Sequence, residues 1–282
     1  MKLQDSQNIL PIEENEETQS VKIFKDLKDE LPTGITEGEH LVKNFSLNEW
    51  NFGVEKRISK ARQDCKTQGQ YVSQVIKNCV KSIGKVEDFA SLEEKEQNFT
   101  LAKLQVGDVF HIYCWVRVDA IDEKVEFNAQ CPSCNNADDY IGNLFEMEVR
   151  TKQKPSDQNG EYKLIKPVKA KEGEIDTFYF HSPMWTFVEN LSQKELLDPA
   201  LYKEKIFQQT IHGTNLRPEG YFLTPDVADQ FNKRDTDGLL DAIEQNIGGP
   251  LLQAKVDCKQ CRYRFNMPFE WRYDNFFSSF SK

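Results

Sequence analysis

Cys131-Pro132-Ser133-Cys134 and Cys258-Lys259-Gln260-Cys261 are two C-x-x-C stretches with 123 residues between them. A C-x-x-C turn brings two sulfurs to one side of a tight loop, and two such turns supply the four ligands of a tetrahedral metal ion. Strand-like runs precede both turns, at residues 124–129 and 251–256. The sequence therefore predicts one strand-borne, zinc-ribbon-like site that joins two distant parts of the chain, with the ligands Cys131, Cys134, Cys258 and Cys261.

Zn²⁺ is the ion that these ligands favour, because structural zinc sites are tetrahedral and rich in thiolates. Four protein ligands leave no position for water or substrate, so the predicted zinc is structural. The interval exceeds the roughly 15–20 residues of short zinc motifs. A metal cross-link that closes so long a loop removes more conformational entropy from the unfolded chain than one that closes a short loop. Two alternatives stay open: a redox C-x-x-C, which needs a cysteine of lowered pKa at a helix start, and thiols that bind nothing.

The composition is that of a folded, acidic protein. Hydrophobic residues make up 38% of the 282 residues, and the formal net charge is −10 with a pI near 5.1. Such a charge repels a polyphosphate backbone, so nucleic acid is a disfavoured partner. The chain has neither a signal-peptide pattern nor the roughly 18 uncharged apolar residues of a membrane span. We expect a cytoplasmic protein whose seven cysteines do not form a disulfide framework.

The predicted fold class is α+β, with helices in the N-terminal part of the domain and in an inserted segment. Residues 1–30 are polar and acidic and predict a flexible arm. Leu31-Pro32-Thr33-Gly34 predicts a turn at which ordered structure begins. Residues 31–282 are expected to form a single zinc-clipped domain with an inserted helical region at about 151–247.

Hydrophobic spacing predicts the individual elements. Residues 47–83 show helical periodicity broken near Gly69, which indicates two amphipathic helices with Cys65 and Cys79 on their apolar faces. Residues 104–119 alternate and are rich in Val, Phe, Tyr and Trp, which favours a strand that forms a hairpin with residues 124–129.

The inserted segment carries its own helix signals. Ser192 and Glu195 form a capping-box pattern for a helix towards Ile211, and Thr224-Pro225 begins a short one. A further helix is expected over about 237–247, where Gly248-Gly249-Pro250 ends it.

Little else in the sequence indicates chemistry. No nucleotide-binding or hydrolase motif occurs, the four histidines are scattered, and Asp138-Asp139 is interpreted as a solvated turn. One candidate acid–base group consists of Asp108, Arg117 and Asp119. However, Gly107-Asp108 has the form of a turn, and Arg117 on a strand is more often an ion-pair partner. We therefore predict a protein that is not an enzyme and has no small-molecule substrate.

Aromatic residues are dense at the end of the chain, at Phe269, Trp271, Tyr273, Phe276, Phe277 and Phe280. So apolar an end is expected to be buried in the protein's own core or against a partner. The candidate partner-binding residues are Trp271, Phe276, Phe277 and Phe280.

Short motifs and their order resemble a phage family. The residues that carry the resemblance are Leu31-Pro32-Thr33-Gly34, Gly107-Asp108, Trp115-Val116-Arg117, Cys131-Pro132-Ser133-Cys134, Asn143-Leu144, Gly249-Pro250, Cys258, Cys261, Phe265 and Phe276-Phe277. Together they are similar to the baseplate hub and tail assembly proteins of T-even-like myophages, over about residues 31–282. The chain departs from the family in having Asn143 in place of an acidic residue and in its long interval between the cysteine pairs.

The resemblance implies a non-enzymatic baseplate hub or tail assembly protein, made as a late protein, that contacts other baseplate or tail proteins. It implies action in the host cytoplasm during assembly and leaves open whether the protein stays in the virion. The alternative is a cellular zinc-ribbon protein that binds nucleic acid or a transcription complex. Lys259, Arg262 and Arg264 form a small basic cluster that suits this alternative, whereas the net charge opposes it.

Overall fold

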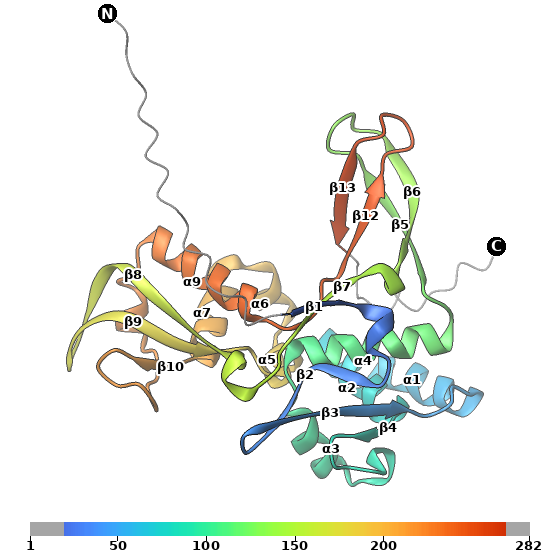
Figure 1. Cartoon of the computed structure of the whole chain (residues 1–282), viewed down its shortest axis with the longest axis horizontal. Coiled ribbons are helices and arrows are strands. Elements are labelled where there is room, and N and C mark those ends of the chain that lie inside the picture. The colour runs from blue at the N-terminus through green and yellow to red at the C-terminus, as the bar shows by residue number, and fades with distance from the viewer. Residues whose placement is uncertain (1–19, 269–282) are drawn as a thin grey trace, which may run out of the picture.

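The computed structural model describes residues 20–268. Figure 1 shows three parts: a body of helices and short sheets, an inserted unit to one side of it, and a ribbon of two hairpins that projects from the body. The ribbon comprises residues 124–143 and 253–268, the inserted unit residues 153–246, and the body the rest of the described chain. The predicted α+β class is confirmed.

The body contains two small antiparallel sheets and four α-helices. One sheet has the order β1-β7-β11 and the other β2-β3-β4. The strands are β1 (Ser20–Ile23), β2 (Glu30–Glu37), β3 (His40–Leu47), β4 (Val80–Ile83), β7 (Glu148–Thr151) and β11 (Gly249–Pro250). The helices are α1 (Phe52–Asp64), α2 (Gln68–Cys79), α3 (Glu94–Leu101) and α4 (Val106–Ala120).

The inserted unit has a hydrophobic core of its own, built between a sheet of order β10-β9-β8 and the surrounding helices. Its strands are β8 (Asn159–Ala170), β9 (Gly173–His181) and β10 (Ile211–Thr214). Its helices are α5 (Trp185–Asn190), α6 (Gln193–Leu197), α7 (Pro199–Thr210), α8 (Pro225–Ala228) and α9 (Lys233–Asn246). The expected helical region therefore contains a three-stranded sheet as well.

Several predicted helix signals are present. The Ser192–Glu195 capping box heads α6, and Pro225 begins α8. The predicted helix towards Ile211 is divided, because the Asp198 side chain caps a new helix at Pro199. The last helix begins at Lys233, since Asn232 caps it there, which is earlier than expected.

The first two body helices are also confirmed, although the break between them falls just before Gly69. Thr67 caps α2, and Gly69 lies within that helix. A Cβ at Gly69 would come 2.5 Å from the Glu189 Cα, so the absence of a side chain allows α2 to pack against α5. Cys79 is buried on α2, and Cys65 is half-buried at the end of α1.

The predicted strand at residues 104–119 and its hairpin with residues 124–129 are wrong: residues 106–120 form α4, and residues 124–130 pair with residues 137–143 instead. Eleven of the 15 residues of α4 are buried, so the helix is apolar on nearly all sides and lacks the stripe that reveals a surface helix. Its β-branched and aromatic content then resembles that of a strand. Packing at the centre of the body overrides this local preference.

The boundary of the predicted arm also needs correction. Strand β1 pairs with β7, with Ser20 opposite Thr151, and the side chains of Phe24 and Leu27 are fully buried. Residues 20–30 therefore belong to the body. The predicted turn at Leu31–Gly34 is wrong as well, because these residues lie within β2 and ordered structure begins before them. Residues 1–19 and the aromatic end from Phe269 onwards, including Trp271, Phe276, Phe277 and Phe280, lie outside the described residues.

Candidate functional site

The two C-x-x-C stretches are the turns of two hairpins that lie side by side in the ribbon. The first hairpin is β5 (Lys124–Gln130) with β6 (Ala137–Asn143), and the second is β12 (Gln253–Asp257) with β13 (Arg264–Pro268). Strands β6 and β12 are in contact. Figure 1 shows both turns together at the free end of the ribbon, away from the body.

The two turns have the same backbone conformation. In each, the N–H of the first cysteine donates to the carbonyl five residues on, and its carbonyl accepts from the N–H four residues on, at N···O distances of 2.9–3.0 Å. The residue after the second cysteine has a left-handed backbone in both, with φ of 58° at Asn135 and 62° at Arg262. This shared geometry directs two sulfurs of each turn towards the opposite turn.

The four sulfurs form one cluster. All four Sγ atoms lie within 4.8 Å of one another. The Cys131–Cys261 distance is 3.7 Å and the Cys134–Cys258 distance is 3.6 Å. With Zn–S bonds of about 2.3 Å, the edge of a regular ZnS₄ tetrahedron is roughly 3.8 Å, so this donor set fits a tetrahedral thiolate-bound ion.

Backbone groups stabilise negative charge on these sulfurs. The N–H of Ser133 points at the Cys131 sulfur at 3.4 Å, and the N–H of Cys261 points at the Cys258 sulfur at 3.5 Å. The pKa of the Cys258 thiol is lowered to about 6, chiefly because of the hydrogen bond from the Cys261 N–H. The pKa of the Cys134 thiol is raised, because the backbone hydrogen bond at Asn136 is outweighed by desolvation and by the other three cysteine side chains. A thiol of lowered pKa is more readily converted to the thiolate that a metal binds. Within residues 20–268, no other group of three or more His, Cys, Asp or Glu side chains converges in this way.

The small basic cluster of the second turn is largely neutralised. Lys259 pairs with Asp138 at 2.8 Å and also donates to the Asp139 carbonyl, so it ties the second turn to the first hairpin. Arg264 makes two hydrogen bonds to Asp257. The interpretation of Asp138-Asp139 as a turn is wrong, because both residues lie in β6 and pair with β5.

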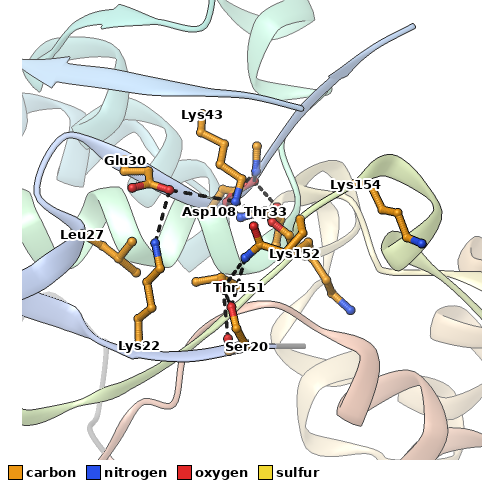
Figure 2. A network of polar contacts seen from close by, with 12 residues as sticks. Ser20, Lys22, Leu27, Glu30, Thr33, Lys43, Asp108, Thr151, Lys152 and Lys154 are labelled. Atoms are coloured by element: carbon orange, nitrogen blue, oxygen red, sulfur yellow. Dashed lines mark hydrogen bonds and ion pairs between the residues drawn. The ribbon is translucent and has the colours of Figure 1, made fainter. Parts of the chain in front are cut away.

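A second site, at the centre of the body, involves the fully buried carboxylate of Asp108. Asp108 lies in the first turn of α4 and accepts from the Thr33 N–H at 2.8 Å, the Gly34 N–H at 3.1 Å and the Thr33 hydroxyl. Burial raises the pKa of Asp108, and the hydrogen bonds from Thr33 oppose that rise. Figure 2 shows Asp108 and Thr33 together, with Lys43 beside them.

The backbone also approaches very closely at this point. A Cβ at Gly107 would lie 1.7 Å from the Gly248 carbonyl oxygen, and one at Gly249 would lie 2.4 Å from the Gly107 Cα. Only glycine allows this contact between α4 and β11. Leu31-Pro32-Thr33-Gly34, Gly107-Asp108 and Gly249-Pro250 thus meet at one place in the body; we call this contact the glycine junction.

The structure does not bring Asp108, Arg117 and Asp119 together. Arg117 is buried and forms the expected ion pair, with Asp122 at 3.2 Å. Asp119 is exposed on α4, and the Asp108 carboxylate accepts hydrogen bonds from Thr33 and Gly34. The histidines remain dispersed apart from His181 and His212, whose rings stack with centroids 5.7 Å apart.

Sequence reasoning missed a buried lysine that links the body to the inserted unit. Lys152 is fully buried, and its Nζ donates to Asn246 Oδ1 at 2.8 Å. Arg150 lies near the carbonyls of Glu244 and Gln245 at 3.4 Å. These cations therefore complement the C-terminal end of α9. No local pattern marks a lysine whose partner is 94 residues away.

No helix in the described part of the chain has the length and apolar character needed to cross a membrane.

The comparisons with known proteins identify a family. Residues 28–191 match the family described as T4 bacteriophage base plate protein. No curated protein and no solved structure match the chain. The matched residues include the first C-x-x-C turn, Leu31–Gly34 and Gly107-Asp108, whereas the second C-x-x-C turn lies beyond them. Because the match covers more than half of the 282 residues, the chain belongs to the T4 bacteriophage base plate protein family.

Proposed function

We propose that the protein is a hub or assembly component of a phage baseplate. It acts through contacts with other baseplate or tail proteins, in the host cytoplasm during assembly, and it is not an enzyme. Membership of the baseplate family carries the proposal. The ribbon supports it, because an element that projects from the body offers surface to neighbouring subunits.

The four cysteines of the ribbon hold a structural Zn²⁺ in this proposal. The S···S distances of 3.6 and 3.7 Å and the fit of the cluster to a tetrahedron support that assignment. Bound zinc would supply a cross-link between the hairpins, and its four thiolate ligands leave no position open for a substrate. The residues themselves position the ligands, through the backbone hydrogen bonds of the two turns and the Lys259–Asp138 pair.

The cross-link has a clear physical role. Each hairpin has two strands, and an isolated two-stranded hairpin is marginally stable in water. The second hairpin returns to the first only after the whole inserted unit, so their association closes a long loop and costs conformational entropy. Four metal–sulfur bonds at the tip offset that cost and hold the projecting end in one shape for its partners.

Complementation of a phage that lacks this gene tests the proposal. We expect plasmid-borne wild-type chain to restore complete baseplates, counted by electron microscopy of infected-cell lysates, and Cys258→Ser to fail. Cys65→Ser is the matched control, because this half-buried thiol lies at the end of α1, outside the cluster. Normal baseplates in the absence of the chain would contradict the proposed role. Full rescue by Cys258→Ser would contradict the need for the metal centre while leaving the baseplate role standing.

A further inference from the structure

Tyr140 has the one buried hydroxyl beside the cysteine cluster that lacks a partner among the described residues. The residue lies on β6, two positions beyond Asp138, and its side chain is 5% exposed. Its hydroxyl is shielded from solvent and makes no hydrogen bond of normal geometry within residues 20–268. The Cys258 sulfur is among the groups within interaction range of this hydroxyl. A buried polar group without a partner requires an explanation, because nearly all such groups in folded proteins are hydrogen-bonded.

Neighbouring side chains fix the direction of the Tyr140 ring. Phe127 stacks on it with centroids 6.3 Å apart, Phe265 meets it edge-on at 5.8 Å, and the Lys259 ammonium lies 5.6 Å from its centroid. These contacts come from β5, β13 and the second cysteine turn, so the ring is enclosed by both hairpins. Because the ring is held in this way, the hydroxyl cannot turn away to find another acceptor.

The chemistry of the sulfur explains the unpartnered hydroxyl. A neutral thiol is a weak acceptor, whereas a metal-bound thiolate carries negative charge and accepts charge-assisted hydrogen bonds. A tyrosine hydroxyl keeps its proton at neutral pH, since its ordinary pKa is about 10, and is therefore a donor. The hydroxyl thus gains a good acceptor when the four cysteines bind a metal ion.

We propose that Tyr140 is a positioning residue of the metal centre, whose hydroxyl donates a hydrogen bond to the metal-bound sulfur of Cys258. This inference rests on the proposed structural metal centre. The Cys258 sulfur then receives two donors, the Cys261 N–H and the Tyr140 hydroxyl. Such outer hydrogen bonds orient the ligand and delocalise its charge, and their removal commonly weakens metal retention by about 10–100-fold.

Tyr140→Phe removes the hydroxyl and keeps the ring that packs between the hairpins. Tyr263→Phe is the matched control, because Tyr263 follows the same cysteine turn but is half exposed, and only its carbonyl bonds to Cys258. Full-length wild-type and variant chains are loaded with Co²⁺ for absorption spectra and with Zn²⁺ for transfer to a chelating dye. The cobalt spectrum reports directly on the sulfur ligands, so a ring that only packs would leave it unchanged.

We expect the sulfur-to-cobalt charge-transfer band of Tyr140→Phe to move to longer wavelength, because a thiolate without its donor is more electron-rich. Zinc transfer should be about tenfold faster than in the wild type, and Tyr263→Phe should match the wild type in both measurements. If the wild type binds metal and Tyr140→Phe gives the same cobalt spectrum and the same rate of zinc transfer, the role of Tyr140 is overturned and the metal centre stands. A wild type that binds neither ion overturns the proposed metal centre, and this inference with it.

Discussion

Two buried ionic side chains, Asp108 and Lys152, lie on either side of the same segment of β2 in the body. Asp108 accepts hydrogen bonds from Thr33 and Gly34, and the carbonyl of the preceding Pro32 accepts one from the Lys152 N–H at 3.0 Å. Figure 2 shows Asp108, Thr33 and Lys152 close together. The Lys43 Nζ donates to the Lys152 carbonyl at 2.5 Å. Burial lowers the pKa of Lys152 to about 8, and the charge of Asp157 opposes that shift.

The depressed pKa of Lys152 predicts a specific pH dependence of stability. The folded state loses this proton near pH 8 and the unfolded state only near its ordinary pKa of 10.5. Between these values the unfolded state binds more protons, so the contribution of Lys152 to the free energy of unfolding rises with pH. Below pH 8 the Lys152 amine is charged in both states, so the cost of burying its charge lowers the free energy of unfolding by its full amount.

Lys152→Met tests this dependence by denaturant titration from pH 7 to 10.5. The stability of the wild type relative to Lys152→Met should increase across the window from pH 8 to 10.5. Lys154→Met is the control for the loss of a nearby positive charge, because Lys154 is two residues away but its side chain is 66% exposed. A constant difference for Lys152→Met over the whole range would show that Lys152 titrates normally.

At the scale of elements, α4 is the centre of the body and the least predictable part of it. Its residues contact β2, β11, α2 and α5, so it is enclosed on several sides. Helical periodicity is informative only when one face of a helix meets water, as in α1, α2 and α9, whose positions could be predicted approximately. Strand β1 was missed for a different reason, because a short strand beside an acidic run has too little apolar content to stand out.

The glycine junction predicts opposite results for two glycines that both lie in helices. Gly107→Ala should destabilise the protein by about 1–3 kcal/mol, because its methyl group would meet the backbone of Gly248 and neither chain can move aside without strain. Gly53→Ala in α1 should be nearly neutral or stabilising, since its nearest new contacts are side-chain atoms of Asn51 and Arg57 at 3.1 and 3.6 Å. Thermal and urea unfolding of both variants measures the effect. Equal stability of the two would show that α4 and β11 are less closely packed than described.

At the scale of the whole molecule, short motifs far apart in the sequence meet in two places. The cysteine pairs meet at the tip of the ribbon, and Leu31–Gly34, Gly107-Asp108 and Gly249-Pro250 meet in the glycine junction. The first meeting could be predicted, because metal coordination requires four ligands and each C-x-x-C turn supplies two. The second could not, because glycine and aspartate have many local uses and nothing in their spacing shows that they touch.

The ribbon tip and the glycine junction are each built from two parts of the chain, and the inserted unit lies between these parts in the sequence. It has its own core and is tied to the body through the end of α9, where Lys152 and Arg150 meet Asn246 and its neighbours. The ribbon and the glycine junction therefore form only when residues from before and after the insertion come together. We expect folding of the ribbon to depend on both the docking of β11 in the body and the metal at the tip.

Native mass spectrometry of the full chain, purified without chelator, tests most directly the claim that all four cysteines share one structural zinc ion. We predict one zinc per wild-type chain, released with unfolding on acidification, and the same single zinc in Cys65→Ser. Cys131→Ser and Cys258→Ser should both lose the metal and a comparable amount of stability, since each removes one ligand of the same ion. A metal-free wild type whose four ribbon thiols are all open to alkylation, or a Cys258→Ser chain that retains its zinc, would contradict the claim.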